Sequence, residues 1–206
     1  MSLPWDDGIE WRTDITSVEP DFYAIPIGFV KSAINVVRTD QDVLIQHYIR
    51  AATGLGERLR GEHIAPKTMT LTLSAFPSSG VIEFADVPVR EIVSVEYVDG
   101  DGASQTYDPG SPPEWVFESG GRHRRARLSP IPGGSWPTAG TQNDAVTVTF
   151  TVGYETDSDV PPEIAQAIVV TVGEFYKSPD LSNGDGLEAN VLSVAHFWPR
   201  RWSNGL

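Results

Sequence analysis

The sequence contains no cysteine. Disulfide bonds, thiolate metal ligands and a cysteine nucleophile are therefore excluded. Long apolar runs are also missing, since no window approaches the roughly 18 consecutive apolar residues of a membrane-spanning helix. The first residues, MSLPWDDGIEW, lack the basic flank and apolar stretch of a secretory signal. We therefore expect no membrane partner and a fold held by side-chain packing or by association with other chains.

Positive charge is scarce, with 15 Lys and Arg against 28 Asp and Glu and a formal net charge of −13. The overall field of such a chain opposes binding to nucleic acid. Solubility is the ordinary explanation of this acidity, and repulsion of DNA is a more specific, functional explanation. The 206 residues, 40% hydrophobic and 21% charged, otherwise resemble a globular protein of one sizeable domain or two small ones.

Residue patterns that carry chemistry are lacking. The histidines His47, His63, His123 and His196 have neither the mutual spacing of metal ligands nor an adjoining acidic cluster. The nucleophile elbow, the zinc-protease motif and the phosphate loop are all absent. The segment DGDG (99–102) superficially resembles a calcium loop, but it lacks the later Glu and better fits a hairpin turn. We expect no catalytic residue, no metal and no cofactor, and hence no enzyme.

Three segments have helical periodicity. PIGFVKSAINVV begins near Pro26, and TDQDVLIQHYIRAATGLGERLRG begins at a capping pattern of Thr39 and Asp42 and ends near residue 61. Gly54 and Gly56 weaken that second helix by about 1 kcal/mol each relative to Ala, but they permit close backbone packing. The third, VPPEIAQAIVVTVGEFYKSPD, starts at a Val-Pro-Pro entry and is stopped by Pro179.

The second and third helices each present one apolar face, and we expect these faces to pack together. The predicted helical core consists of Leu44, Ile45, Tyr48, Ile49, Leu55, Ile164, Ile168, Val172, Phe175 and Tyr176. The intervening sequence instead has a period of two residues or reads as hairpins: KTMTLTLSAF, VIEFADVPV, EIVSVEYVDGDGASQTYD, PEWVFESGGRHRRARLSP and DAVTVTFTVGYE. These short strands with Gly and Pro turns predict a small antiparallel sandwich or barrel.

The predicted fold class is α+β, an antiparallel helical base of three main helices interrupted by the β insert, with extended N- and C-terminal segments. The expected boundaries are an N-terminal arm at 1–25, the first part of the helical base at 26–62, the β insert at 63–155, the last helix at 156–180 and a C-terminal loop and partner-binding tail at 181–206. The arm shows no clear period, and we expect its aromatic residues to pack on the domain or on a neighbour.

The densest positive cluster is RHRRAR, with Arg122, Arg124, Arg125 and Arg127. One interpretation is contact with nucleic acid phosphate. The other, which the net charge favours, is a hairpin edge whose arginines pair with acidic residues of the same or a neighbouring subunit. In a ring of identical copies, this cluster would form a basic patch on one rim.

The C-terminal segment HFWPRRW (196–202) combines aromatic residues with arginine, the residue types enriched in interface hot spots. Trp198 and Trp202 would be a liability if they were exposed without a partner. They therefore either bind another protein or dock back on their own domain, and the sequence leaves both alternatives open.

Four segments, in their order and spacing, resemble the head–tail connector (adaptor) proteins of long-tailed bacteriophages and gene transfer agents. They are VKSAINVVRTDQDVLIQHYIRAATGLGERL, VPVREIVSVEYVDGDGASQTYDP, VTVTFTVGYETDSDVPPEIAQAIVVTVGEFYKSPD and the closing FWPRRW. The matching features include Lys31 before an acid-started second helix, Gly-Tyr at 153–154 leading to Val-Pro at 160–161, and Tyr176 near the end of the late helix. Residues 1–24 and 181–190 depart from the family pattern, which leaves the N-terminal contacts and the exact docking of the tail open.

The resemblance implies an adaptor ring, commonly of twelve copies, between the portal protein and the stopper or tail-completion protein. Such a ring is made in the host bacterial cytoplasm, resides in the neck of the virion and extends the DNA exit channel, so that DNA passes through without specific binding. The portal-binding role carries over to Phe197, Trp198, Arg200, Arg201 and Trp202. A negatively charged lumen would let DNA pass without adhering.

Two other function classes remain as alternatives. A non-catalytic β-sandwich binding module of a tail or baseplate, recognising carbohydrate or a host surface, would use the β insert alone. It has no need of amphipathic helices on both sides of that insert, so the helices favour the adaptor. An enzyme is disfavoured because the catalytic constellation is missing.

Overall fold

The computed structural model describes residues 8–107, 114–120, 124–177 and 198. These residues form two compact units, each described by itself below. The β unit comprises residues 8–18 and 66–153, and the helical unit comprises residues 19–65, 154–177 and 198. The chain changes unit at Val18, Ala65 and Gly153.

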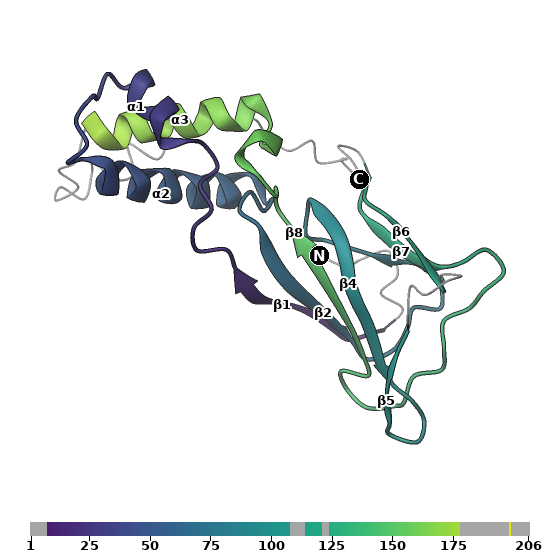
Figure 1. Ribbon diagram of the computed structural model, residues 1–206. Coiled ribbons are helices and arrows are strands. Elements are labelled where there is room, and N and C mark those ends of the chain that lie inside the picture. Colours follow the sequence, from purple (N-terminus) through teal and green to yellow (C-terminus); the bar gives the residue numbers. More distant parts are fainter. Residues whose placement is uncertain (1–7, 108–113, 121–123, 178–197, 199–206) are drawn as a thin grey trace. The chain divides into compact units, whose positions relative to one another are not determined.

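The β unit contains two antiparallel sheets (Figure 1). The larger sheet has the order β1-β2-β8-β4-β5, with β1 Trp11–Val18, β2 Lys67–Leu73, β8 Val146–Val152, β4 Val89–Val98 and β5 Ser104–Thr106. The smaller sheet has the order β3-β7-β6, with β3 Ile82–Glu83, β7 Arg127–Pro130 and β6 Trp115–Glu118. The prediction of antiparallel strands is confirmed.

Side chains from both sheets meet in one hydrophobic core. On β8, the alternating residues Val146, Val148, Phe150 and Val152 are all fully buried, as the period of two predicts. Opposite Phe150, Met69 of β2 is its register partner and belongs to the same core. The smaller sheet contributes Ile82, Leu128 and Trp115, so the two sheets are stabilised by burying a shared apolar surface.

The expected N-terminal arm contains a strand that the sequence did not reveal. β1 runs antiparallel to β2, with Thr13 opposite Leu71, and a bulge interrupts the register between Ile15 and Ser17. Because β1 is an edge strand that is exposed over most of its length, its sequence lacks the apolar alternation of an inner strand. Farther along the arm, Phe22 and Tyr23 pack against the core of the helical unit.

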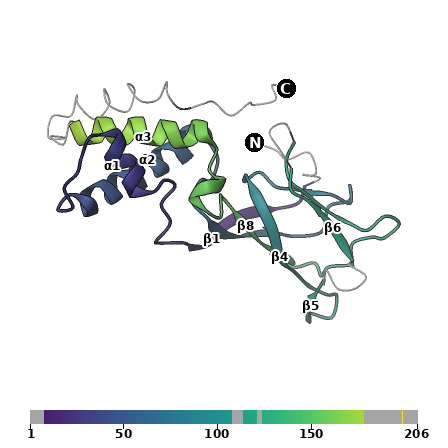
Figure 2. The ribbon, with the colours of Figure 1, turned by 45° about the horizontal axis from the view of Figure 1, so that its top comes forward.

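The helical unit contains α1 Ile27–Ala33, α2 Asp42–Arg60 and α3 Pro162–Lys177, with a short 3₁₀ helix at Asp157–Asp159 leading into α3. α2 and α3 lie side by side and run in opposite directions (Figures 1 and 2). The mixed α and β composition with three α-helices in the described residues agrees with the predicted fold class. Among these helices, none is long and apolar enough to cross a membrane.

Most of the residues expected in the helical core are inaccessible to solvent. Ile45, Ile49, Leu55, Ile164, Ile168 and Val172 are buried, while Tyr48, Phe175 and Tyr176 are partly buried against that core. The prediction is wrong for Leu44, which was expected in the core but is 41% exposed. It lies about 100° around the helix from Ile45, and Ile45, Ile49 and Ala52 take up the face that is turned to the core.

The start of α2 differs from the prediction. Gln41 occupies the N-cap position without a side-chain cap, so the expected capping pattern of Thr39 and Asp42 does not form. The carboxylate of Asp42 instead accepts a hydrogen bond from the ammonium group of Lys31 on α1, at 2.6 Å. A charged donor outcompetes a neutral backbone N–H for a carboxylate. The end of α2 is as predicted, with Gly61 in the left-handed conformation.

Candidate partner-binding site

The C-terminal tail was predicted to bind the portal through Phe197, Trp198, Arg200, Arg201 and Trp202. Only Trp198 lies among the described residues, and the other four lie outside them. Trp198 is 3% exposed and belongs to the hydrophobic core of the helical unit. The candidate site is therefore built around the place where this indole enters the core.

The indole of Trp198 lies against Gly56 of α2. A Cβ atom added at Gly56 would come within 2.1 Å of Cη2 and Cζ3 of Trp198, a distance that no real side chain tolerates. The requirement for glycine at this position is therefore one of space. The prediction that a glycine of α2 permits close packing holds for Gly56, where the space is filled by a ring from the C-terminal segment.

The polar edge of the same indole is bound to α3. Nε1 of Trp198 donates a hydrogen bond to Oγ1 of Thr171 at 3.2 Å, and this hydroxyl donates in turn to the carbonyl of Ala167 at 2.7 Å. Thr171 is completely buried, so the hydroxyl and the indole N–H satisfy each other away from water. Together with Gly56, these contacts fix both the position and the rotation of the ring.

Trp198 is therefore buried within its own chain, whereas the sequence analysis assigned it to the portal-binding residues. Of the two alternatives for the C-terminal aromatics, docking on the same domain holds for this residue. The sequence signal was ambiguous because a buried anchor and an exposed hot spot favour the same residue type. The sequence feature that could have distinguished a buried anchor from an exposed hot spot is Gly56, a residue without a side chain inside a predicted helix.

The basic cluster is partly neutralised inside the chain. Arg124 forms an ion pair with Glu118, and Arg127 forms one with Glu83 of β3. Arg122 lies outside the described residues. These two pairs agree with the alternative that the net charge favoured. Among the described residues, Nη1 of Arg125 and Nε of Arg127 are buried without a hydrogen-bond partner.

The turn between β4 and β5 is closed by Asp99. Its carboxylate accepts hydrogen bonds from the side chain of Gln105 at 2.8 Å and from the backbone N–H groups of Ala103 at 2.9 Å and Asp101 at 3.0 Å. These donors, Gln105 foremost, lower the pKa of Asp99 below its ordinary value. The DGDG segment is thus a hairpin turn, as predicted. Within the described ranges, no group of three or more His, Cys, Asp or Glu residues could hold a metal ion.

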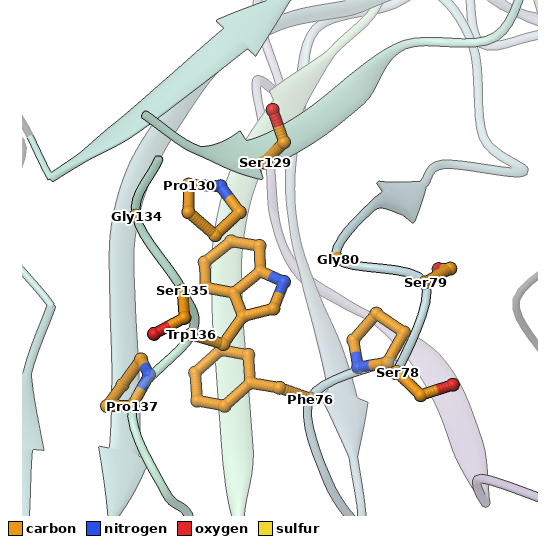
Figure 3. Close-up of a pocket in the computed structure, with 11 residues that line it drawn as sticks. Phe76, Ser78, Ser79, Gly80, Ser129, Pro130, Gly134, Ser135, Trp136 and Pro137 are labelled. Carbon is orange, nitrogen blue, oxygen red and sulfur yellow. The ribbon is translucent and has the colours of Figure 1, made fainter. Parts of the chain in front are cut away.

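A second feature, which sequence reasoning missed, is a pocket in the β unit (Figure 3). Its walls come mainly from the loops FPSSG (76–80) and GGSWP (133–137). The rings of Phe76 and Trp136 stack within it, with centroids 4.8 Å apart and planes 8° from parallel. The available signal was the repeated combination of an aromatic residue with Pro, Ser and Gly in two separate loops.

Comparison with known proteins gives a likeness of fold. No protein-family model matches the chain, and no curated protein matches it. Among solved structures, it is similar to a chain of the virion of a native gene transfer agent particle, with 18% identity, a TM-score of 0.66, and coverage of 94% of this chain and 98% of that one.

Two related structures give the same result. The neck of the native particle, computed with C12 symmetry, contains a chain with 19% identity and a TM-score of 0.65. The neck of the empty particle, computed with C6 symmetry, contains one with 18% identity and a TM-score of 0.65. Coverage is again 94% of this chain and 98% of the other in both cases. The chain therefore has the fold of a neck component of gene transfer agent particles.

Proposed function

We propose that this chain is a structural, non-catalytic head–tail adaptor of a phage or phage-like particle. Made in the host cytoplasm, it forms a ring of twelve copies between portal and stopper and extends the DNA exit channel. The observation that carries the proposal is the shared fold, which extends over 94% of this chain and 98% of a chain from a neck computed with C12 symmetry. Both units are included in that likeness, so it covers far more than a common β module.

Exposed apolar side chains in the helical unit support assembly with further copies. Val37 is 91% exposed, Val43 is 77% exposed and Phe29 is 59% exposed, all within the segment that spans α1 and the start of α2. The three residues lie within 14 positions of one another in the sequence, and contiguous exposed apolar surface is typical of protein contacts. We assign this segment, defined as residues 29–43, to the contact between neighbouring copies in the ring.

We propose that the C-terminal tail is anchored to the helical unit at Trp198 and reaches the portal from there. Trp198 is held between α2 and α3, and the other candidate residues, Phe197, Arg200, Arg201 and Trp202, are at most four positions from it in the sequence. A nearby anchor lowers the entropy that these residues lose on binding. In this proposal Trp198 positions the tail, and the neighbouring arginines and aromatics contact the portal.

The net charge of −13 supports passage of DNA through the ring. In this proposal, acidic side chains line the lumen and repel the phosphate backbone, so that DNA moves without adhering. The alternative function, a non-catalytic binding module of a tail or baseplate, uses only the β unit. It leaves the helical unit with its buried Trp198 anchor unexplained, so the adaptor accounts for more of the chain.

The proposal is tested by mixing the purified chain with the portal ring of its own particle and imaging the complex by electron microscopy. We expect a ring of this chain attached coaxially to the portal. The control is a variant that lacks residues 199–206, which should remain folded but should bind the portal weakly. A chain that stays unbound at all concentrations, or that attaches to the distal tail instead, would contradict the adaptor role.

A further inference from the structure

One side of β1 pairs with no other strand in the part of the chain that the structure describes. β1 is the first strand in the order of the larger sheet, and only β2 is bonded to it (Figure 1). The N–H of Ser74 donates to the carbonyl of Glu10 at 3.0 Å, and these two residues continue the register of β1 and β2 as a hydrogen-bonded pair. Such pairs alternate along an antiparallel ladder. Arg12 is therefore bonded to β2, whereas the N–H and C=O groups of Thr13 and Ile15 point to the open side.

This open side lacks most of the features that keep edge strands from pairing. Proline, lysine and a short length are common protections, but β1 has 8 residues and its sequence, WRTDITSV, contains neither proline nor lysine. The bulge between Ile15 and Ser17 comes only after a regular stretch that starts at Trp11. Ile15 is 54% exposed although its register partner, Met69, belongs to the core. The apolar face of the sheet thus extends to an edge that can accept a further strand.

The side chains of the regular stretch are arranged symmetrically about Thr13. Trp11 and Ile15, two positions away on either side, share the face that is turned to the core. Arg12 and Asp14, one position away on either side, share the opposite face. If a second copy pairs antiparallel with Thr13 opposite Thr13, Arg12 of each copy lies opposite Asp14 of the other. In the same register, Trp11 lies opposite Ile15, so an apolar side chain meets an apolar one.

Charge selects this register among its neighbours. A slip that keeps the outward N–H and C=O groups paired moves the symmetry axis from Thr13 to Arg12 or to Asp14. Either slip places two identical charges directly opposite each other, which is destabilising, whereas opposite charges in these positions are stabilising. The segment is therefore complementary to itself in one register, which favours a second copy of this chain as its partner.

The charged side chains are accessible for such a contact. Arg12 and Asp14 are 57% and 58% exposed, and they form an ion pair at 2.9 Å within the strand. Asp144 also binds the guanidinium group of Arg12, at 2.9 Å. A second copy would add its own Arg12 and Asp14 in reverse order, so positive and negative groups would alternate around the axis. A network of this kind contributes more than an isolated exposed ion pair.

We propose that two copies of this chain pair through their β1 strands, antiparallel and with Thr13 opposite Thr13, so that the two five-stranded sheets become continuous. Each Thr13 exchanges two hydrogen bonds with the Thr13 of the other copy. A two-fold contact closes on itself and recruits no third copy. The dimer is therefore a form of the free chain, in which the edge is protected from pairing with other proteins. The inference does not depend on the adaptor proposal.

The test is sedimentation velocity of the full-length chain between about 1 µM and 1 mM. A paired edge of this length is a small interface, so we expect a reversible dimer with a Kd on the order of 100 µM. Thr13→Pro removes an outward N–H that the ladder with β2 does not use, at an edge position that tolerates proline. It should retain the circular dichroism of the parent chain and weaken the dimer by at least about tenfold, or about 1.4 kcal/mol.

Charge reversal tests the register independently of the backbone. Arg12→Asp places carboxylates at both positions, and Asp14→Arg places guanidinium groups at both. Each variant alone should dimerise about tenfold more weakly than the parent chain. An equimolar mixture of the two should form a heterodimer about as tight as the parent dimer, because every charge again faces its opposite. The double variant, Arg12→Asp with Asp14→Arg, should also dimerise with itself.

Three results would overturn the proposal. The parent chain could remain monomeric up to about 1 mM. Thr13→Pro could associate as well as the parent, which would place the contact elsewhere in the chain. Finally, neither the mixture nor the double variant could associate better than the single charge variants, which would exclude the pairing of Arg12 with Asp14.

Discussion

The indole nitrogen of Trp198 donates a hydrogen bond to the hydroxyl oxygen of Thr171, 3.2 Å away. The opposite edge of the ring occupies the space where a side chain at Gly56 would lie. One residue of the C-terminal segment thus bridges α2 and α3, the two long helices of its unit. The helical unit is therefore completed by a residue 21 positions beyond the last residue of α3, Lys177.

Gly56→Ala should destabilise the helical unit. Replacing glycine by alanine inside a helix normally stabilises it by about 0.5–1 kcal/mol. Here the new methyl group collides with the indole, so we expect a net loss of about 1–3 kcal/mol. The measurement is the free energy of unfolding by urea. In a Trp198→Ala background, the same substitution should regain its ordinary stabilising sign.

The matched control is Gly54→Ala, two positions away on α2. A Cβ atom added at Gly54 meets no described atom within 4 Å, apart from its chain neighbours and the helix's own nearby backbone. This variant should be stabilised by about 0.5–1 kcal/mol. Equal effects at positions 54 and 56 would contradict the packing of Trp198 against Gly56.

Thr171→Val should cost about 1–3 kcal/mol, because it conserves shape but leaves a buried indole N–H without an acceptor. Thr53→Val is the control. Thr53 is also buried, and its hydroxyl also donates to a carbonyl one turn earlier, that of Ile49 at 2.8 Å. The difference between the two variants in urea unfolding measures the bond to Trp198. If both lose the same stability, the indole is not held by Thr171.

Lys31→Met should remove the ion pair that links α1 to the start of α2 and lower the stability of the helical unit. Lys31 and Asp42 are 2.6 Å apart, and the lysine side chain is only 14% exposed. Removing it strands a partly buried carboxylate, at an expected cost of about 1–2 kcal/mol. Arg38→Met is the comparison, because Arg38 pairs with Asp40 at a site where it is 77% exposed. Arg38→Met should change the unfolding free energy by less than about 0.5 kcal/mol. An effect as large as that of Lys31→Met, or larger, would contradict the prediction.

The periodic elements could be predicted from sequence because each buries one regular face. β8 alternates without interruption, and α3 is bounded by prolines, so both local patterns agree with the final packing. β1 escaped prediction because an edge strand needs no apolar alternation. The start of α2 was mispredicted because Asp42 has a stronger partner in Lys31 than the N-terminus of its own helix.

The candidate site was predictable only in part. The composition of the tail marked Trp198 as important, but its contacts with Gly56 and Thr171 join segments 142 and 27 positions away in sequence, and no local pattern encodes them. The pocket of the β unit escaped for the same reason. Phe76 and Trp136 belong to separate loops, and only the antiparallel pairing of the strands brings them into contact.

The pH dependence of the β4–β5 turn follows from Asp99. Its pKa is lower in the folded protein than in the unfolded chain, so its contribution to stability is present above the unfolded pKa and is lost as pH falls through the folded pKa. NMR titration of the Asp99 carboxyl should therefore give a midpoint below that of an unfolded peptide with the same sequence. Gln105→Ala removes the strongest donor and should raise this midpoint, and an unchanged midpoint would contradict the assigned cause.

The proposed contact between copies is tested at Val37, the most exposed of the apolar side chains in residues 29–43. Val37→Glu should leave the stability of the single chain within about 0.5 kcal/mol, since the residue is at the surface. In a ring it should place a charge at an apolar contact and prevent assembly on the portal. Val37→Ile is the control and should assemble normally. Normal assembly of Val37→Glu would show that residues 29–43 do not form the contact between copies.

Cryo-electron microscopy of this chain bound to the portal ring of its own particle tests the adaptor role. We expect a coaxial ring of twelve copies, with Trp198 buried at Gly56 and residues 199–202 in contact with the portal. Density for Arg200, Arg201 or Trp202 against a portal subunit would support the assigned role of the tail. A portal without this ring would rule out the adaptor role, and a ring that still forms undiminished without residues 199–206 would rule out portal binding by the tail.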